Sequence, residues 1–382
     1  MRLNIRRWLF LGFSLRALNA LWNGFFGPSI AADGDAASFH YWAVQYAVES
    51  FGREFNIGSS PYITALGMFY YVTTDSLFLG SLLSCIAWLL SALIFLSCLR
   101  LVSVQSVVQS KMVMIYAFLP SSIIYTSITI REAYQMLFVN IAIYAALKIF
   151  IHKSARHWLA LILATACAGM LHTGLMAFGV IFFATTIVFV FMSRQDEKSL
   201  LTKGVVVIIS FAILSYGYSI LGDHFSGSTY NFEAGPESAI RQYQENLAAV
   251  DARTNYRSEV GISGLKDLIT VIPIGLFQYM FEPLPWHISG LQDVILLFEN
   301  IVRGWLLLII WKAFRISTLP KKNVLRFTFF SYLIMETIWS LGTGNWGTSV
   351  RHHLPALGLL LIAFCIASIE TPSSKNSTFR KR

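Results

Sequence analysis

Long apolar segments alternate with short polar connectors along most of the chain, and this pattern predicts a protein that crosses a membrane many times. A transmembrane helix needs about 20 mainly apolar residues. We count ten segments close to that length, at residues 8–26, 77–99, 112–130, 133–151, 158–192 (two segments), 204–221, 291–311, 327–341 and 354–369. The predicted fold is therefore all-α, a single integral membrane domain over residues 1–382 with about ten transmembrane helices.

The distribution of Lys and Arg orients these helices. Basic clusters lie in the connectors near residues 100–111, 153–156, 194–203 and 312–326. Cytoplasmic connectors carry an excess of Lys and Arg. Ten spans place nearly all of these clusters in the cytoplasm, together with both termini and the basic tail at residues 370–382.

Two regions on the opposite, outer side depart from the simple pattern. Residues 27–76 contain no apolar run of membrane length, so we expect an outer loop with short interfacial helices that place Tyr and Trp at the depth of the headgroups. Residues 222–289 form a large polar outer loop. Within it, residues 268–281 are apolar but too short to cross and include Pro273, which predicts a re-entrant or interfacial helix on the same side.

The first apolar segment follows a basic start and so resembles a signal peptide. Three polar residues interrupt it, however, at spacings of three and four that share one helical face: Arg16, Asn19 and Asn23. This stripe favours a retained transmembrane helix that turns the polar groups inward. Hydrogen bonding to neighbouring helices and a functional role are both consistent with it.

Composition excludes several classes of protein. Apolar residues make up 55% of the chain and charged residues 13%, which argues against a soluble enzyme. The formal charge of +9 is accounted for by the cytoplasmic connectors, so we predict no nucleic-acid partner. The four cysteines lie in apolar segments without CxxC spacing, and they predict neither a disulfide framework nor a zinc site.

Acidic residues open the first outer loop, at Asp33 and Asp35. A carboxylate there, in contact with water and with a lipid-linked substrate, could serve as a general base or hold a divalent cation. Capping of the helix that begins near Ala36 is the structural alternative. No cofactor is assigned, and a divalent cation is the one candidate.

The connector GTGNWGTSVRHHLPALG, residues 342–358, is the strongest candidate site. The planar guanidinium of Arg351 suits bidentate binding of a phosphate. His352 and His353 could transfer a proton, but neighbouring side chains point apart on a helix, so they do not suit one metal ion and no metal site is assigned. Anchoring at the membrane interface is the alternative for all three residues.

Other outer residues are secondary candidates. Arg131 and Glu132 form either a local ion pair or a phosphate-binding tip, and His172 is better explained as a packing residue. Inside the eighth segment, Glu299 and Arg303 predict a structural intramembrane pair at i and i+4. Additional candidates for binding a glycan or its phosphate are Arg241, Arg257 and the aromatic residues Trp286 and Trp346, although belt aromatics at the interface explain the last two equally well.

The order of these parts resembles that of multi-pass glycosyltransferases of the GT-C type and of Wzy-type polysaccharide polymerases. The likeness rests on Asp33 and Asp35 in the first outer loop, Pro120 before the Arg131-Glu132 hairpin, the EPLPWHIS turn at 282–289 and GTSVRHHLP near the end. It implies transfer of a sugar or oligosaccharide from a polyprenyl-linked donor on the outer face of a bacterial inner membrane. By this likeness Asp35 or Asp33 matches the acidic loop position, and Arg351 and Arg241 match the phosphate-binding arginines.

The resemblance leads to a functional hypothesis with two alternatives. The chain has no soluble C-terminal domain, which favours a repeat-unit polymerase of O-antigen or exopolysaccharide, whereas the acidic first loop keeps a transferase of a single sugar open. An acceptor hydroxyl, assisted by Asp35 or His352, would attack the glycan while Arg351 and Arg131 hold the leaving phosphate. A transporter or flippase of lipid-linked glycans is the second alternative. The expected partners are a polyprenyl-(di)phosphate-linked glycan, membrane lipid and other polysaccharide-assembly proteins.

Overall fold

The computed structural model describes residues 2–48, 60–192, 254–256, 268–315 and 321–370. The described part of the chain is 84% helix and has no strand, which confirms the all-α class. Five of its helices are long and apolar enough to cross a membrane: α4 (Leu77–Leu101), α7 (Glu132–His152), α9 (Thr173–Met192), α13 (Leu291–Phe314) and α14 (Lys322–Leu341). A bent pair of helices near the end of the chain would make a sixth.

These five helices coincide with five of the ten predicted segments. The first segment is α1 (Arg2–Phe25), and the fifth is α8 (His157–Leu171), which has 15 residues. Residues 268–281 form the short helix α12 (Leu268–Phe281). The predicted segment at 204–221 lies outside the described residues.

The third predicted segment is not one continuous helix. The structure divides it into α5 (Ser106–Phe118) and α6 (Pro120–Tyr125), followed by a turn that leads into α7. Pro120 has no N–H to donate to the preceding turn, and its ring clashes with the helical carbonyl behind it. The helix therefore breaks at Leu119, and residues 126–130 form a buried, non-helical turn.

The last predicted segment is also interrupted. The short helix α15 (Trp346–His352) is followed by α16 (Leu357–Glu370), and the two are bent by 65°. Pro355 lies in the connection, where it interrupts the hydrogen-bond ladder for the same reason as Pro120. The bend leaves α15 as a short segment with its own orientation.

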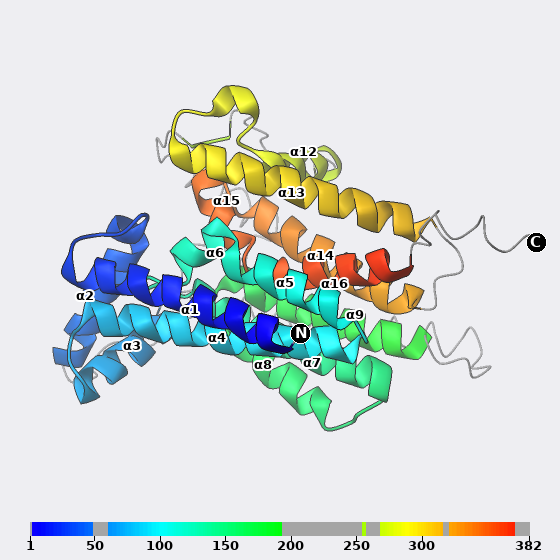
Figure 1. Cartoon of the computed structure of the whole chain (residues 1–382), viewed down its shortest axis with the longest axis horizontal. Helices are drawn as coiled ribbons and strands as arrows, with labels where there is room; N and C mark the ends of the chain where they lie inside the picture. The colour runs from blue at the N-terminus through cyan, green and yellow to red at the C-terminus, as the bar shows by residue number, and fades with distance from the viewer. Residues whose placement is uncertain (1, 49–59, 193–253, 257–267, 316–320, 371–382) are drawn as a thin grey trace, which may run out of the picture.

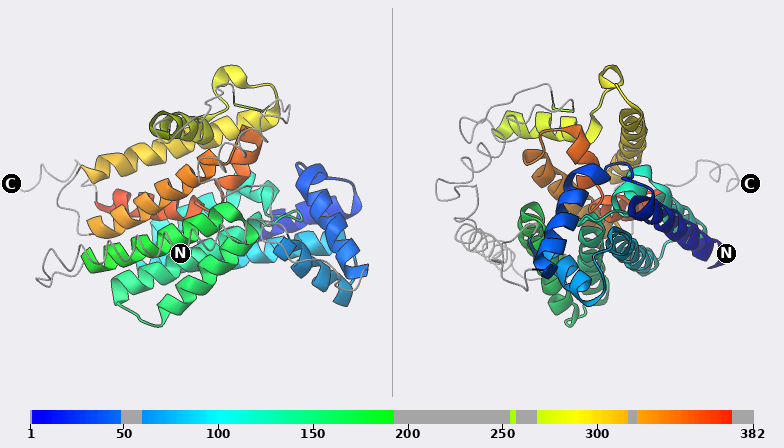
Figure 2. Two further views of the ribbon diagram at one scale, coloured as in Figure 1. Left: turned by 180° about the vertical axis from the view of Figure 1, so that it is seen from behind. Right: turned by 90° about the vertical axis from the view of Figure 1, so that its left-hand side faces the viewer.

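The long helices run side by side along the long axis of the molecule (Figure 1). The short helices of the first loop, η1 (Ala32–Ala36), α2 (Ala37–Val48) and α3 (Ser60–Val72), extend from one end of this bundle. Seen from behind, α7, α8 and α9 form one flank, and α13 and α14 lie on the other side (Figure 2). The main apolar core joins both parts, since it combines residues of α4, α5 and α7 with residues of α14 and α16.

The polar stripe of α1 faces neighbouring helices, as predicted. Arg16 is fully buried and lies 3.6 Å above the ring of Trp88. Its guanidinium donates to the hydroxyls of Thr126 (2.6 Å) and Ser122 (2.8 Å) and to the carbonyl of Ala117 (2.8 Å). Similar contacts are made by the other two members of the stripe, Asn19 to Ser127 and Asn23 to Ser81. The stripe therefore docks α1 on α4, α5 and α6, which favours the structural interpretation.

Candidate functional site

Helix α15 carries the Arg351 side chain at the end of the bundle from which the first loop extends (Figure 1). Asn345 caps the helix, and its side-chain oxygen accepts from the N–H of Thr348 at 2.7 Å. Trp346 anchors the first turn, because its buried indole N–H donates to Asp293 Oδ1 at 3.1 Å. These contacts fix the direction in which Arg351 leaves the helix.

Arg351 joins two carboxylates that are distant in sequence. Its Nη1 bonds Asp35 Oδ2, and its Nε lies 3.7 Å from Glu132 Oε1. The side chain of Asp35 is half exposed, whereas that of Glu132 is buried. Arg351 Nε and Glu132 Oε2 have no hydrogen-bond partner among the described residues. Three chain segments thus meet in one charged centre.

A second guanidinium lies beside this centre. Nη1 of Arg131 donates to the carbonyl of Leu171 at 2.9 Å, and its guanidinium lies 5.6 Å from the centre of the Phe39 ring. Burial, together with the positive charges of Arg131 and Arg351, holds the pKa of His172 well below its usual value of 6.5. The positive charges of Arg131 and Arg351 therefore act on the same region around His172, and both would attract an anionic ligand there.

The two histidines nearest to this region belong to a packed aromatic cluster. The ring of His352 stacks on Trp339 at 4.1 Å, and His172 contacts the same indole at 4.4 Å. Nδ1 of His352 lies 3.0 Å from the hydroxyl of Thr343, and Nδ1 of His172 accepts from the N–H of Gly174 at 3.1 Å. His352 is buried, which is not the position expected of a base that meets an acceptor hydroxyl. For His172, the packing interpretation agrees with this geometry.

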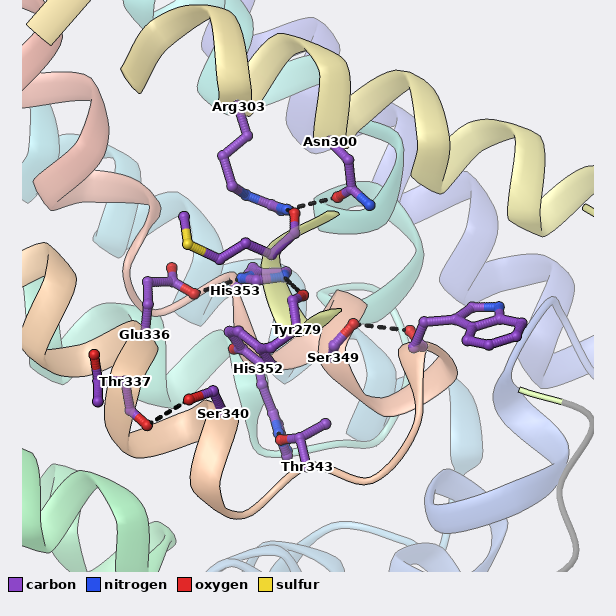
Figure 3. Close-up of polar contacts among 12 residues, drawn as sticks. Tyr279, Asn300, Arg303, Glu336, Thr337, Ser340, Thr343, Ser349, His352 and His353 are labelled. Carbon is purple, nitrogen blue, oxygen red and sulfur yellow. Dashed lines mark hydrogen bonds and ion pairs between the residues drawn. The ribbon is translucent and has the colours of Figure 1, made fainter. Parts of the chain in front are cut away.

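His353 and its neighbour His352 take different partners, in agreement with the expectation that these two side chains point apart. Its Nδ1 lies 2.6 Å from Glu336 Oε2, and its Nε2 lies 3.0 Å from the carbonyl oxygen of Tyr279 (Figure 3). Both His353 and Glu336 are buried. His353 therefore belongs to an internal cluster and is not a substrate ligand in this structure.

The remaining candidates are distributed more widely. Asp33 is exposed on η1, two residues before Asp35. Trp286 is 72% exposed, so its ring is open to a sugar, whereas Trp346 is buried and stacks on His287, which leaves it unsuited to that role. Arg241 and Arg257 lie outside the described residues. Within the part of the chain that is described, no group of three His, Cys, Asp or Glu residues could hold a metal ion.

The predicted pair on α13 takes different partners. Both carboxylate oxygens of Glu299 accept from Ser121, from its backbone N–H at 2.8 Å and from its hydroxyl at 2.7 Å. Arg303 donates to Asn300 Oδ1 at 2.6 Å and to the carbonyl of Met280 at 2.8 Å. Each residue therefore links α13 to another element, α6 in one case and α12 in the other.

Sequence reasoning did not single out Glu336, although a signal for it was present. It is the one acidic residue in the apolar segment 327–341. An ionisable residue in a membrane-length apolar segment is costly and is therefore expected to have a partner. The identity of that partner, His353, depends on the bend between α15 and α16.

An apolar groove lies beside the bundle core. It has a volume of about 560 Å³ and is bordered by α1, the α5–α6 break and α13. Phe298 on its wall is 63% exposed, so the groove opens to the outside of the bundle. Its lining residues are Trp8, Met114, Ile115, Phe118, Leu119, Pro120, Phe298, Glu299 and Val302.

These features define a class: an all-helical protein with several helices fit to span a membrane and a paired-charge centre at one end of the bundle. Comparison with protein-family models, with curated proteins and with solved structures found no match for this chain. The function is therefore inferred from the chemistry of the site.

Proposed function

We propose that the protein is a membrane glycosyltransferase of cell-surface polysaccharide assembly. In this proposal it is a repeat-unit polymerase of a bacterial inner membrane, with ten spans, cytoplasmic termini and a polyprenyl-diphosphate-linked glycan as donor on the periplasmic face. The observation that carries it is the meeting of Arg351 with Asp35, 316 residues away, and with Glu132. An arginine fork beside carboxylates supplies both a phosphate ligand and a general base.

The reaction follows from exchange of partners at Arg351. The donor diphosphate displaces Asp35 from the guanidinium, because a phosphate matches the arginine fork and carries more charge. The freed Asp35 then accepts the proton of the acceptor hydroxyl as the oxygen forms a bond to the anomeric carbon. The bond from that carbon to the phosphate oxygen breaks, and Arg351 and Arg131 stabilise the negative charge on the departing polyprenyl diphosphate.

The apolar groove supports a lipid-linked donor. Its lining is almost entirely hydrocarbon, and α6, which begins at the groove, also packs on α15. A polyprenyl chain in this groove would direct its phosphate along α6 toward Arg351. Transfer of a single sugar from a polyprenyl-phosphate donor would use the same centre, and the length of the product distinguishes the two reactions.

Replacement of Arg351 tests the proposal. Arg351→Ala removes the phosphate ligand, and we expect a decrease of about 100-fold in polymer formation, with accumulation of the lipid-linked repeat unit. Arg351→Lys keeps the charge without the fork and should retain a small part of the activity. The measurements are the chain length of surface polysaccharide in a complemented deletion strain and the amount of protein in the membrane.

The matched control is Arg156→Ala, which removes an exposed arginine at the start of α8. It should leave polymer length unchanged. Normal polymer in the Arg351→Ala strain, at a normal protein level, would contradict the assignment.

A transporter of lipid-linked glycans is the second candidate, and one observation favours it. Glu299, Arg303 and Glu336 are all buried within long apolar helices. Intramembrane ionisable groups are typical of transport pathways. Movement of fluorescent polyprenyl-phosphate glycan across vesicles that contain only this protein would favour transport over transfer.

A further inference from the structure

A small polar cavity lies inside the bundle, at the junction of α6, α13, α14 and the α15–α16 bend. Its volume is about 20 Å³, close to the space that one water molecule needs. Polar groups from four different elements border it, namely Ser121, Arg303, Tyr332, Glu336 and His353. Four leucines complete the lining: Leu119, Leu354, Leu357 and Leu360. The cavity has room for one water molecule, and the polar groups on its wall supply the partners that such a water needs.

The Glu336–His353 contact holds one proton, as a count of donors shows. A carbonyl oxygen can only accept, so the 3.0 Å contact with Tyr279 requires a hydrogen on Nε2 of His353. The 2.6 Å contact between Nδ1 and Glu336 Oε2 then needs a second hydrogen between the two atoms. The pair is either imidazolium with carboxylate or imidazole with carboxylic acid, and it carries no net charge in either form.

Two polar atoms beside this pair lack partners. Glu336 Oε1 and Tyr332 Oη are buried, with relative exposures of 0% and 1% for their residues. The Tyr332 hydroxyl faces the Glu336 carboxyl group, but neither atom has a hydrogen bond of good geometry among the described residues. Leaving such a group unpaired costs about 1–3 kcal/mol. A water molecule in the cavity would bond both atoms, since it can donate to the carboxyl oxygen and accept from the phenol.

Arg303 is the positively charged side chain that faces the pair. It lies on α13, and Glu299, four residues before it on the same helix, has Ser121 as its partner. The other titratable groups nearby are neutral hydroxyls or a stacked imidazole: Tyr279 of α12, Tyr332 of α14 and His352 of α15. When the proton leaves, the positive charge of Arg303 at the same cavity stabilises the Glu336 carboxylate that remains, so the proton can leave or return.

We propose that Glu336 and His353, with this cavity, form an internal proton-binding site that holds one exchangeable proton and one water molecule. The site is distinct from the Arg351 centre and faces the other side of α15. Loss of the proton places the Glu336 carboxylate against the lone pair of the imidazole, which removes the link between α14 and α15. Proton occupancy thereby sets how tightly the end of α15 is held to α14, while the bond from Nε2 of His353 to α12 remains.

Infrared difference spectroscopy of the purified full-length protein tests this site. Spectra recorded between about pH 5 and pH 9, in H₂O and in D₂O, report gain and loss of a proton at a buried carboxyl group. In the wild type we expect a pH-dependent band from Glu336: a carboxylic-acid C=O band that shifts in D₂O if the proton rests on Glu336, or a shifted carboxylate band if it rests on His353. Glu336→Gln should abolish it while preserving the fold, because the amide N–H can donate to neutral His353 in the same geometry.

The matched control is Glu299→Gln, which changes a buried carboxylate on the neighbouring helix and should leave the band in place. His353→Gln offers a second variant, in which the band should persist but lose its pH dependence over this range. Identical spectra for the wild type and Glu336→Gln would overturn the proposal. Loss of the band in Glu299→Gln, with the band still present in Glu336→Gln, would overturn it as well. Polymer formation is not part of the measurement, so the result is independent of the proposed transferase activity.

Discussion

Two arginines in this protein are held in opposite ways. Arg16 is fully enclosed, and its partners are neutral hydroxyls and carbonyls of α1, α5 and α6. Arg351 lies at one end of the bundle, where its side chain is 21% exposed and its partners are the carboxylates of Asp35 and Glu132. The first site is closed and specific to one packing arrangement, whereas the second is open and its partners can be exchanged.

This comparison indicates which of the two arginines is able to bind a ligand. Acceptors around Arg16 are fixed by the backbone of the α5–α6 break, so no incoming anion could reach the guanidinium without separating the helices. At Arg351, an anion has only to displace a half-exposed carboxylate. Exposure and the nature of the partner, more than the presence of a positive charge, therefore separate a packing arginine from a binding one.

The largest effect on stability is expected for Arg16→Ala. The substitution leaves several buried acceptors unpaired and opens a cavity beneath Trp88. We expect a loss of about 3 kcal/mol or more in the free energy of unfolding. Thermal unfolding in detergent measures it, and a wild-type melting temperature would show that α1 is not docked through this side chain.

Arg351→Ala should destabilise the protein less, by about 2 kcal/mol, because it leaves the buried carboxylate of Glu132 without its positive partner. Adding Glu132→Gln should recover roughly half of that loss, because burying a neutral amide without a positive partner costs less free energy than burying a carboxylate. Equal stability of the single and double variants would argue against the Arg351–Glu132 interaction.

A smaller effect depends on pH through His172. The pKa of this histidine is lowered in the folded protein, so below about pH 6.5 the unfolded chain binds a proton that the folded chain does not. Stability is therefore lost as the pH falls below that value, by about 1 kcal/mol at pH 5.5. His172→Gln should reduce the slope of this part of the stability profile, measured by chemical denaturation across the pH range.

Asp35→Asn should have the smallest effect on stability, under about 1 kcal/mol, because the ion pair with Arg351 is exposed to solvent. Its effect on activity should be large, with a decrease of about 100-fold or more if Asp35 is the general base. Asp33→Asn, two residues away on the same turn, is the control and should keep activity near that of the wild type.

The sequence predicts the helical class and five of the long helices because an apolar segment of membrane length can adopt few structures other than a helix. It also places Asp35, Arg131 and Arg351 among the outer candidates, and the structure brings the first and last of these into contact. That contact was not predictable from spacing, since it depends on where η1 and α15 end after the chain has folded.

The breaks at Pro120 and Pro355 explain most of what pattern analysis missed. An apolar run with one proline still resembles a span, because hydropathy does not register a missing N–H. In the folded chain these breaks bring Ser121 to Glu299 and His353 to Glu336. Buried polar partners of this kind become visible in the sequence only as isolated charges in apolar segments.

The short helix α15 has a mechanical consequence. Arg351 and His353 are separated by one residue, yet Arg351 binds Asp35 in the charged centre and His353 contacts Glu336 in the interior. A rotation of this short helix would strain both contacts at once. Binding of an anion at Arg351 would thus also change the Glu336–His353 contact, because both residues lie on or next to α15.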